Sequence, residues 1–115
     1  MTDTEPVTPA QRQPAVVALP AEIDIANADS LSAQIAAQFA GGARVVIADM
    51  AATTFCDTSG TRALVLASRH ATAVGAELRL LRPSPRVMRV WKILGVDAAL
   101  PIYHSLDDAL TGETR

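Results

Sequence analysis

Hydrophobic and polar residues alternate along this chain with a period that switches repeatedly between that of a strand and that of a helix. Five segments show the compact apolar run or two-residue alternation typical of strands, at 15–19, 22–25, 44–50, 77–80 and 102–104. Four segments repeat apolar residues at helical spacing, at 28–40, 59–74, 85–94 and 106–110. Because strands alternate with helices, the pattern predicts an α/β domain in which crossover helices join parallel strands.

Three of the predicted helices each carry one apolar stripe that needs a hydrophobic surface to pack on. The stripes are Leu31, Ile35 and Phe39; Leu64, Ala67 and Ala71; and Val87, Trp91 and Leu94. The continuous apolar run from Val45 to Ala48 suits a central strand that is covered on both faces. We therefore predict a sheet of four or five strands around Val45–Ala48, with Trp91 mostly buried.

Capping residues mark where the predicted helices begin. Asn27 and Asp29 are candidates for the first helix, Ser84 precedes Pro85 at the start of the third, and Ser105 precedes the last. These residue types place helix ends where the periodicity also places them, so the two signals agree.

The chain has 115 residues, which is the size of a single domain. Prolines at 6, 9 and 14 interrupt regular strand pairing, so we interpret residues 1–14 as a flexible N-terminal arm. The domain itself is predicted to span 15–111, and 112–115 form a C-terminal tail.

Composition narrows the class of protein. Half of the residues are hydrophobic but only four are aromatic, so the core is predicted to be aliphatic. A single cysteine, Cys56, excludes an internal disulfide. There is no N-terminal apolar leader and no apolar run of membrane-spanning length, so we expect a cytoplasmic protein without a membrane partner.

Charge is distributed unevenly along the chain. Between Arg62 and Lys92 there are seven basic residues and one acid, Glu77, whereas the rest of the chain is acidic and the net charge is -2. No nucleic-acid recognition motif or interleaved aromatic residues accompany this basic segment. Solvated helix faces explain it more simply, and we predict no direct nucleic-acid partner.

Motifs of catalysis are missing from the sequence. There is no dinucleotide-binding or phosphate-binding glycine loop, no nucleophile elbow, and no metal-ligand spacing around His70 or His104. Neither Thr58 nor Ser59 has an evident base, which nucleophilic catalysis would need. We therefore predict no catalytic residue, no metal and no cofactor.

One stretch, Phe55 to Arg62, stands where an apolar strand gives way to a helix. It places Asp57, Thr58 and Ser59 at the helix start, where the first backbone N-H groups lack partners and an oxygen or a phosphate is held favourably. From spacing alone a helix cap is the simpler interpretation.

The same stretch resembles a known family. Val45 to Met50, followed by Thr54 to Gly60, is similar to the strand and phospho-acceptor loop of anti-sigma factor antagonists, the STAS domain family, whose pattern is Phe-x-Asp, two hydroxyl residues and Gly. Ala21 to Asp24 resembles the family's Gly-Glu-Leu-Asp, and Leu80 to Asp97 resembles its strand, Ser-Pro and helix. The resemblance covers about residues 15–110.

The resemblance implies a STAS-type fold, with a mixed sheet of four to five strands and about four helices. It also implies a binding switch that regulates transcription. The unphosphorylated form would bind an anti-sigma factor that is a serine/threonine kinase and so free a sigma factor. Phosphorylation of Thr58, or alternatively Ser59, would end binding, and a serine/threonine phosphatase would reverse it. The implied partner-binding residues are Glu22, Asp24, Asp57, Thr58, Ser59, Gly60, Thr61 and Arg62.

Two departures from the family pattern bear on the partner. Thr61 and Arg62 stand where the family has an apolar and a small residue, so we expect an altered partner surface, and Ala21 replaces a glycine. Two alternatives stay open: a constitutive STAS subunit of a lipid-transport ATPase complex, which would ignore phosphorylation, and a small hydrolase. A weak homodimer also stays open.

Overall fold

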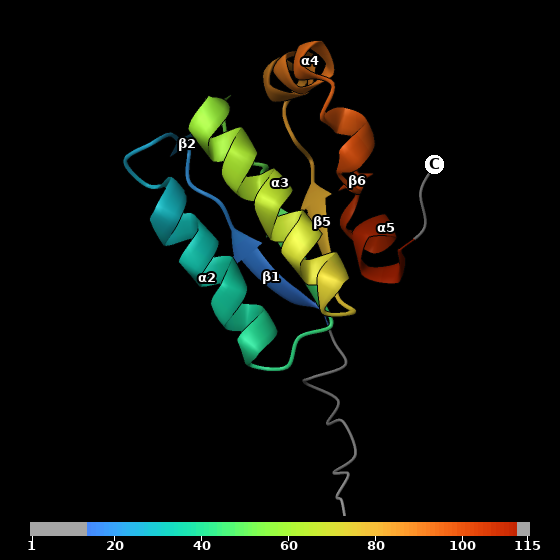
Figure 1. The fold of residues 1–115 in the computed structure, drawn as a ribbon. Coiled ribbons are helices and arrows are strands. Elements are labelled where there is room, and N and C mark those ends of the chain that lie inside the picture. The colour runs from blue at the N-terminus through green and yellow to red at the C-terminus, as the bar shows by residue number, and fades with distance from the viewer. Residues whose placement is uncertain (1–13, 113–115) are drawn as a thin grey trace, which may run out of the picture.

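The computed structural model describes residues 14–112, so nearly all of the predicted arm and tail lie outside the described residues (Figure 1). The helices are α2 (Ala28–Ala40), α3 (Thr58–Ala73), α4 (Pro85–Leu94) and α5 (Leu106–Thr111), with a 3-10 turn, η1, at Asp97–Ala99. The strands are β1 (Ala15–Ala18), β2 (Glu22–Ile23), β3 (Val45–Asp49), β4 (Phe55–Cys56), β5 (Glu77–Leu81) and β6 (Ile102–Tyr103). The predicted α/β class is confirmed, and each predicted helix and strand overlaps an observed one, although the strand predicted at 22–25 ends at Ile23 and neither β4 nor η1 was predicted.

Four strands form the main sheet, in the order β1-β3-β5-β6, while β2 and β4 form a separate pair. The predicted centre is confirmed, since β3 lies between two partners and Val46, Ile47 and Ala48 are fully buried. A mixed sheet was expected from the resemblance. All strand pairings within residues 14–112 are parallel instead. The parallel pairing follows from the connections, because α2, α3 and α4 each cross between successive strands of the main sheet.

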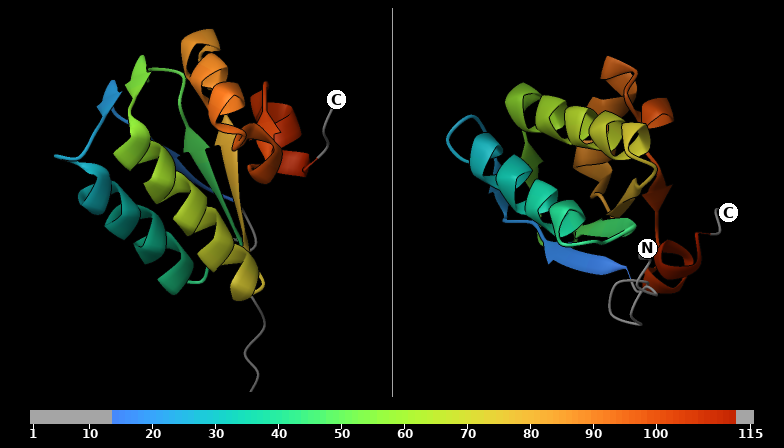
Figure 2. Two further views of the ribbon diagram at one scale, coloured as in Figure 1. Left: turned by 45° about the horizontal axis from the view of Figure 1, so that its top comes forward. Right: turned by 60° about the horizontal axis from the view of Figure 1, so that its bottom comes forward.

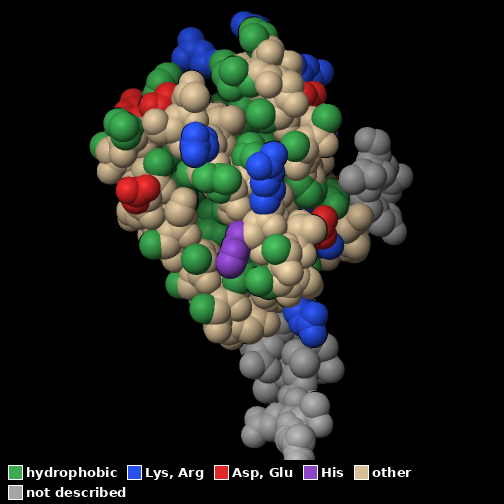
Figure 3. All heavy atoms as spheres, viewed as in Figure 1, with side chains coloured by type: hydrophobic (Ala, Val, Ile, Leu, Met, Phe, Trp, Pro, Cys, Tyr) green, Lys and Arg blue, Asp and Glu red, His purple; other side chains and the backbone are tan. Residues whose placement is uncertain are grey.

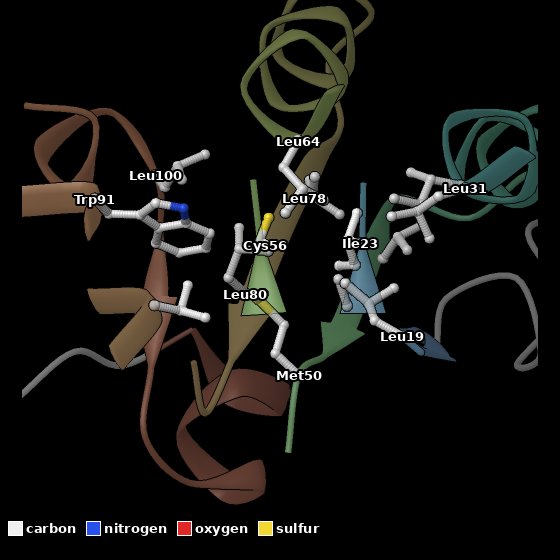
Figure 4. Close-up of a cluster of buried hydrophobic side chains, with 14 of the residues drawn as sticks. Leu19, Ile23, Leu31, Met50, Cys56, Leu64, Leu78, Leu80, Trp91 and Leu100 are labelled. Atoms are coloured by element: carbon white, nitrogen blue, oxygen red, sulfur yellow. The ribbon is translucent and has the colours of Figure 1, made fainter. Parts of the chain in front are cut away.

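The helices lie in two layers on opposite faces of the sheet (Figure 2). Alternate residues of β3 divide the core between these faces. Val46 and Ala48 belong to the larger cluster, to which α2, α3 and α4 contribute Leu31, Leu64 and Trp91, among others (Figure 4). On the other face, Ile47 packs with Leu81, Tyr103 and Ala109 from β5, β6 and α5.

Residues at helix ends test two cap predictions and one burial prediction. The hydroxyl groups of Ser84 and Ser105 accept hydrogen bonds from the backbone N-H groups of Val87 (3.2 Å) and Asp108 (3.1 Å), as predicted. Leu94 was expected in the buried stripe of α4 but is 47% exposed. It is the last residue of the helix, and Gly95 then turns the chain away through a left-handed conformation (φ 75°).

Candidate functional site

The short strands β2 and β4 bring two acidic residues to one place. Ile23 pairs with Cys56 in parallel register, and the backbone N-H of Asp57 donates to the carbonyl of Ile23 at 3.0 Å. Asp24 and Asp57 are the next residue on each strand, so they lie side by side at the carboxyl ends of the pair. Asp24 therefore lies close to the loop that begins α3.

Asp57 caps α3, as the spacing alone predicted. Its carboxylate accepts a hydrogen bond from the backbone N-H of Gly60 at 2.9 Å, and its carbonyl accepts the N-H of Thr61 at 2.9 Å. This capping arrangement fixes the direction in which α3 leaves the loop. It therefore also fixes where the next two residues, Thr58 and Ser59, point.

Thr58 and Ser59 line different grooves on the two sides of α3. Thr58 is exposed at the first position of the helix and lines a groove of about 440 Å³ between α3 and the end of α4, here called the α3/α4 groove. Ser59 is half-buried and lines a groove of about 560 Å³ between α2 and α3, the α2/α3 groove. Arg62 and Leu66 line both grooves.

Asn27 plays a part that the sequence did not indicate. It stands at the N-cap position of α2, as predicted, but its side chain makes no bond to that helix. Instead its amide donates to the carbonyl of Glu22 at 2.8 Å and accepts the N-H of Asp24 at 2.9 Å. The carbonyl of Asp24 in turn accepts the N-H groups of Asn27 and Ala28, which ends β2 after two residues. Asn27 thus holds the acidic end of β2 in place.

Gly60 is buried because α3 starts directly on top of the β2 and β4 pair. A Cβ added at Gly60 would lie 2.5 Å from Ile23 Cγ2 and 3.0 Å from Cys56 Sγ. Only glycine lets the helix approach the strands this closely.

Thr61 is also an interior residue, with 3% of its surface exposed. Its hydroxyl oxygen accepts a hydrogen bond from the indole N-H of Trp91 at 3.1 Å and lies 3.6 Å from Cys56 Sγ. The buried indole predicted for Trp91 is confirmed and has its partner here. Gly60 and Thr61 were predicted to be partner-binding residues, but both are buried, so they contribute little to the exposed surface. Of the two departures after Gly60, only Arg62 changes the exposed surface.

Apolar residues near the loop are exposed, and the sequence pattern did not predict their exposure. They are Ile25 (80% exposed), Phe55 (45%), Leu66 (48%) and Leu94. Ile25 lines the α2/α3 groove, and Leu66 and Leu94 line the α3/α4 groove. Apolar side chains gathered on a surface mark a site of protein contact more often than singly scattered ones do. Ile25 was assigned to a longer strand, which hid its exposure.

The basic segment has the simpler explanation that its pattern favoured. All of its basic side chains are exposed except Arg79, which is half-buried. Arg79 forms an ion pair with Glu77 at 2.8 Å and donates to the carbonyl of Ala109 at 2.7 Å. The segment therefore supplies solvated faces of α3 and α4 and one bond that attaches α5.

The loop offers hydroxyl groups to which another protein could transfer a group such as a phosphate. Burial raises the pKa of the Cys56 thiol, the hydrogen bond with Thr61 lowers it, and the charge of Asp57 raises it, so the thiol stays protonated. Within residues 14–112 nothing hydrogen-bonds the hydroxyl of Thr58, no His, Cys, Asp and Glu cluster could hold a metal, and no helix could span a membrane.

Comparisons with known proteins agree with these features. A profile of the STAS domain matches residues 5–109. BtrV of Bordetella bronchiseptica, for which a role as anti-sigma factor antagonist has been proposed, is 30% identical over 94 residues, or 82% of this chain and 81% of BtrV. An anti-sigma factor antagonist from Mycobacterium paratuberculosis superimposes with a TM-score of 0.75 at 27% identity, covering 87% of this chain and 85% of the other.

SpoIIAA, an anti-sigma factor antagonist from Bacillus, is similar in both of its solved forms. The unphosphorylated form gives a TM-score of 0.71 at 26% identity, over 96% of each chain. The phosphorylated form gives 0.66 at 26% identity, over 94% of this chain and 95% of the other.

Proposed function

The chain belongs to the STAS domain family, and we propose that it is an anti-sigma factor antagonist whose binding is switched by phosphorylation of Thr58. The unphosphorylated chain binds an anti-sigma factor with serine/threonine kinase activity and so frees a sigma factor. Phosphate transfer to Thr58 separates the complex, and a serine/threonine phosphatase restores the binding form. The chain itself acts in the cytoplasm as a regulator, with no cofactor and no catalytic residue.

The observation that carries this proposal is the position of Thr58. It is the first residue of α3, exposed, directly after a capping aspartate, and among the described residues nothing hydrogen-bonds its hydroxyl group. A kinase needs a hydroxyl that can enter its active site without unfolding the substrate. Thr58 meets that requirement better than Ser59, which is half-buried between two helices.

Electrostatics at the loop support a switch in the direction of release. A phosphate adds about -1.5 to -2 charge units. On Thr58 this charge would stand next to Asp57 and near Asp24, within a surface that carries apolar side chains for a partner. Desolvating that additional charge opposes rebinding.

The relatives support the same proposal. SpoIIAA is an anti-sigma factor antagonist that exists in phosphorylated and unphosphorylated forms, and the two forms match this chain over most of its length. The partner-binding surface we propose consists of Glu22, Asp24, Asp57, Thr58, Ser59 and Arg62, extended by the exposed apolar residues Ile25, Phe55, Leu66 and Leu94.

Tandem mass spectrometry after incubation with the cognate anti-sigma kinase and ATP tests the proposal. We expect one phosphate on Thr58, no phosphate on Thr58→Ala, and a phosphate still on Thr58 in the matched control Ser59→Ala. Phosphate on Ser59 alone would show the residue assignment to be wrong. A chain that takes up no phosphate would support the constitutive subunit of a lipid-transport ATPase, and turnover by the chain alone would support a hydrolase.

A further inference from the structure

The α3/α4 groove carries charge of one sign only. Its lining consists of Thr58, Thr61, Arg62, Val65, Leu66, Arg69, Leu94 and Val96. The two arginines are exposed, and no acidic residue lines the groove. On this face of the molecule some basic side chains lie amid hydrophobic ones near the middle, while other basic side chains and the acidic ones lie nearer the edges (Figure 3).

Thr58 and Arg62 are neighbours on the surface of α3. Residues four apart in a helix have Cβ atoms about 5–6 Å from each other, within reach of a long side chain. Both residues line the α3/α4 groove, so this spacing places them on the same side of the helix. Arg62 forms no ion pair with any described residue, and one carboxylate oxygen of Asp57 accepts the N-H of Gly60. The guanidinium of Arg62 is therefore free to bind an anion at Thr58.

We propose that the α3/α4 groove is a binding site for the phosphate ester on Thr58 itself, with Arg62 as the side chain that holds it. The inference rests on the proposed function, in which Thr58 is the phosphorylated residue. A guanidinium presents a planar fork of N-H donors that matches two phosphate oxygens. The phosphate then cancels the positive charge that this groove offers a partner, so one modification both adds negative charge and withdraws Arg62.

The neighbouring hydroxyl lacks this arrangement. A phosphate on Ser59 would enter the α2/α3 groove, which Asp29 also lines. The two hydroxyl groups are adjacent in sequence, but only the groove at Thr58 is free of acidic side chains. Arg62 lines both grooves, so it is Asp29 that distinguishes the two sites electrostatically.

The test uses the full chain with phosphothreonine incorporated at position 58 during translation, so it needs no kinase. The second pKa of the phosphate, about 6 in a free phosphoamino acid, is measured by phosphorus NMR titration. A nearby cation favours the dianion and lowers this pKa. We compare wild type, Arg62→Gln, the charge-preserving Arg62→Lys, and Arg69→Gln as the matched control. Asp24, Asp57, Lys92 and Asp97 stay unchanged throughout, so their charges contribute equally.

We expect the phosphate pKa to be roughly 0.2 to 0.7 pH units higher in Arg62→Gln than in wild type, as a surface ion pair would give. Arg62→Lys should recover part of the difference, Arg69→Gln should change the pKa less than Arg62→Gln, and high salt should remove the effect. Equal pKa values in wild type and Arg62→Gln, or a larger change in Arg69→Gln, would overturn the inference. Because the phosphate is installed without a kinase, failure here leaves the proposed function standing, and failure of kinase transfer leaves this measurement unaffected.

Discussion

The two grooves beside α3 share a wall but differ in charge. The α2/α3 groove is the larger one and mixes Asp29 with Arg62 and His70, together with apolar residues of both helices. The α3/α4 groove has arginine as its only charged lining, and its apolar walls come from α3 and the end of α4. Consecutive hydroxyl residues, Ser59 and Thr58, open into one groove each. A shift of one residue along the chain therefore changes the whole surrounding of a phosphate.

This difference arises from helix geometry. Successive residues of an α-helix point about 100° apart, so two adjacent side chains at a helix start diverge at once. The cap formed by Asp57 and the close packing of Gly60 hold the start of α3 against the strands, so the directions of the two side chains are fixed relative to the sheet. Kinase specificity for one of two neighbouring hydroxyl groups can thus be built into the substrate.

The largest expected effect is a loss of partner affinity, which should differ between variants in the two grooves. Thr58→Asp should weaken binding to the anti-sigma kinase by roughly 2 to 5 kcal/mol, or more than tenfold, because it places a charge in the contact surface. Ser59→Asp should weaken it less, since that charge enters the other groove. Thr58→Ala should bind as wild type does, and it should stay folded because Asp57 provides the cap. Titration calorimetry in the presence of ADP measures these affinities.

Two results would contradict this ordering. Equal affinities of Thr58→Ala and Thr58→Asp would place the loop outside the interface. Equal weakening by Thr58→Asp and Ser59→Asp would mean that the two grooves act as one surface.

A second effect concerns the packing that positions both grooves. Gly60→Ala should lower the free energy of unfolding by about 2 to 3 kcal/mol, because its Cβ would overlap the branched side chain of Ile23 in the core. Gly41→Ala is the matched control, since Gly41 has φ −79° and its nearest neighbour would be a carbonyl oxygen at 3.4 Å. It should change stability by no more than about 0.5 kcal/mol. Urea unfolding followed by circular dichroism compares them, and similar losses in both would refute the packing argument.

The smallest expected effect follows from loss of the hydrogen bond between Trp91 and Thr61, and it should be confined to the α3/α4 groove. Thr61→Val keeps the shape of the side chain but leaves the buried N-H of Trp91 without its acceptor, which should cost about 1 to 2 kcal/mol. Thr61→Ser retains the hydroxyl group and should lose less. Amide chemical shifts should move at the groove residues of α3 and α4 and stay unchanged in α2. Shifts spread equally over α2 would show that the bond does not act locally.

Much of the fold could be predicted because local signals agree with each other. The helix at 28–40, the start of α4 after Ser84 and the central position of Val45–Ala48 each follow from periodicity and capping chemistry, and the structure has them there. Such features depend on neighbours in sequence, which a single chain displays directly.

The parts that could not be predicted depend on particular contacts, some between distant residues and some within a turn. Thr61 looked like a surface residue because it follows an exposed loop, yet an indole 30 positions away makes it interior. Likewise, Asn27 reads as an ordinary helix cap until the carbonyl of Glu22 and the N-H of Asp24 are seen beside it. Ile25 fitted a strand alternation that ends two residues earlier, where Asp24 begins a turn. The pattern of apolar and polar residues reports none of these contacts, whether near or distant in sequence.

Trp91 is the only tryptophan in the chain, and its indole nitrogen is bonded to a residue three positions after Thr58. Indole emission responds to the polarity and hydrogen bonding around the ring, so the protein carries a built-in optical probe within its switch. All tryptophan fluorescence of the chain comes from Trp91, beneath the loop. A partner without tryptophan would add no emission of its own to that signal. Stopped-flow mixing could then time docking and release in the unlabelled protein.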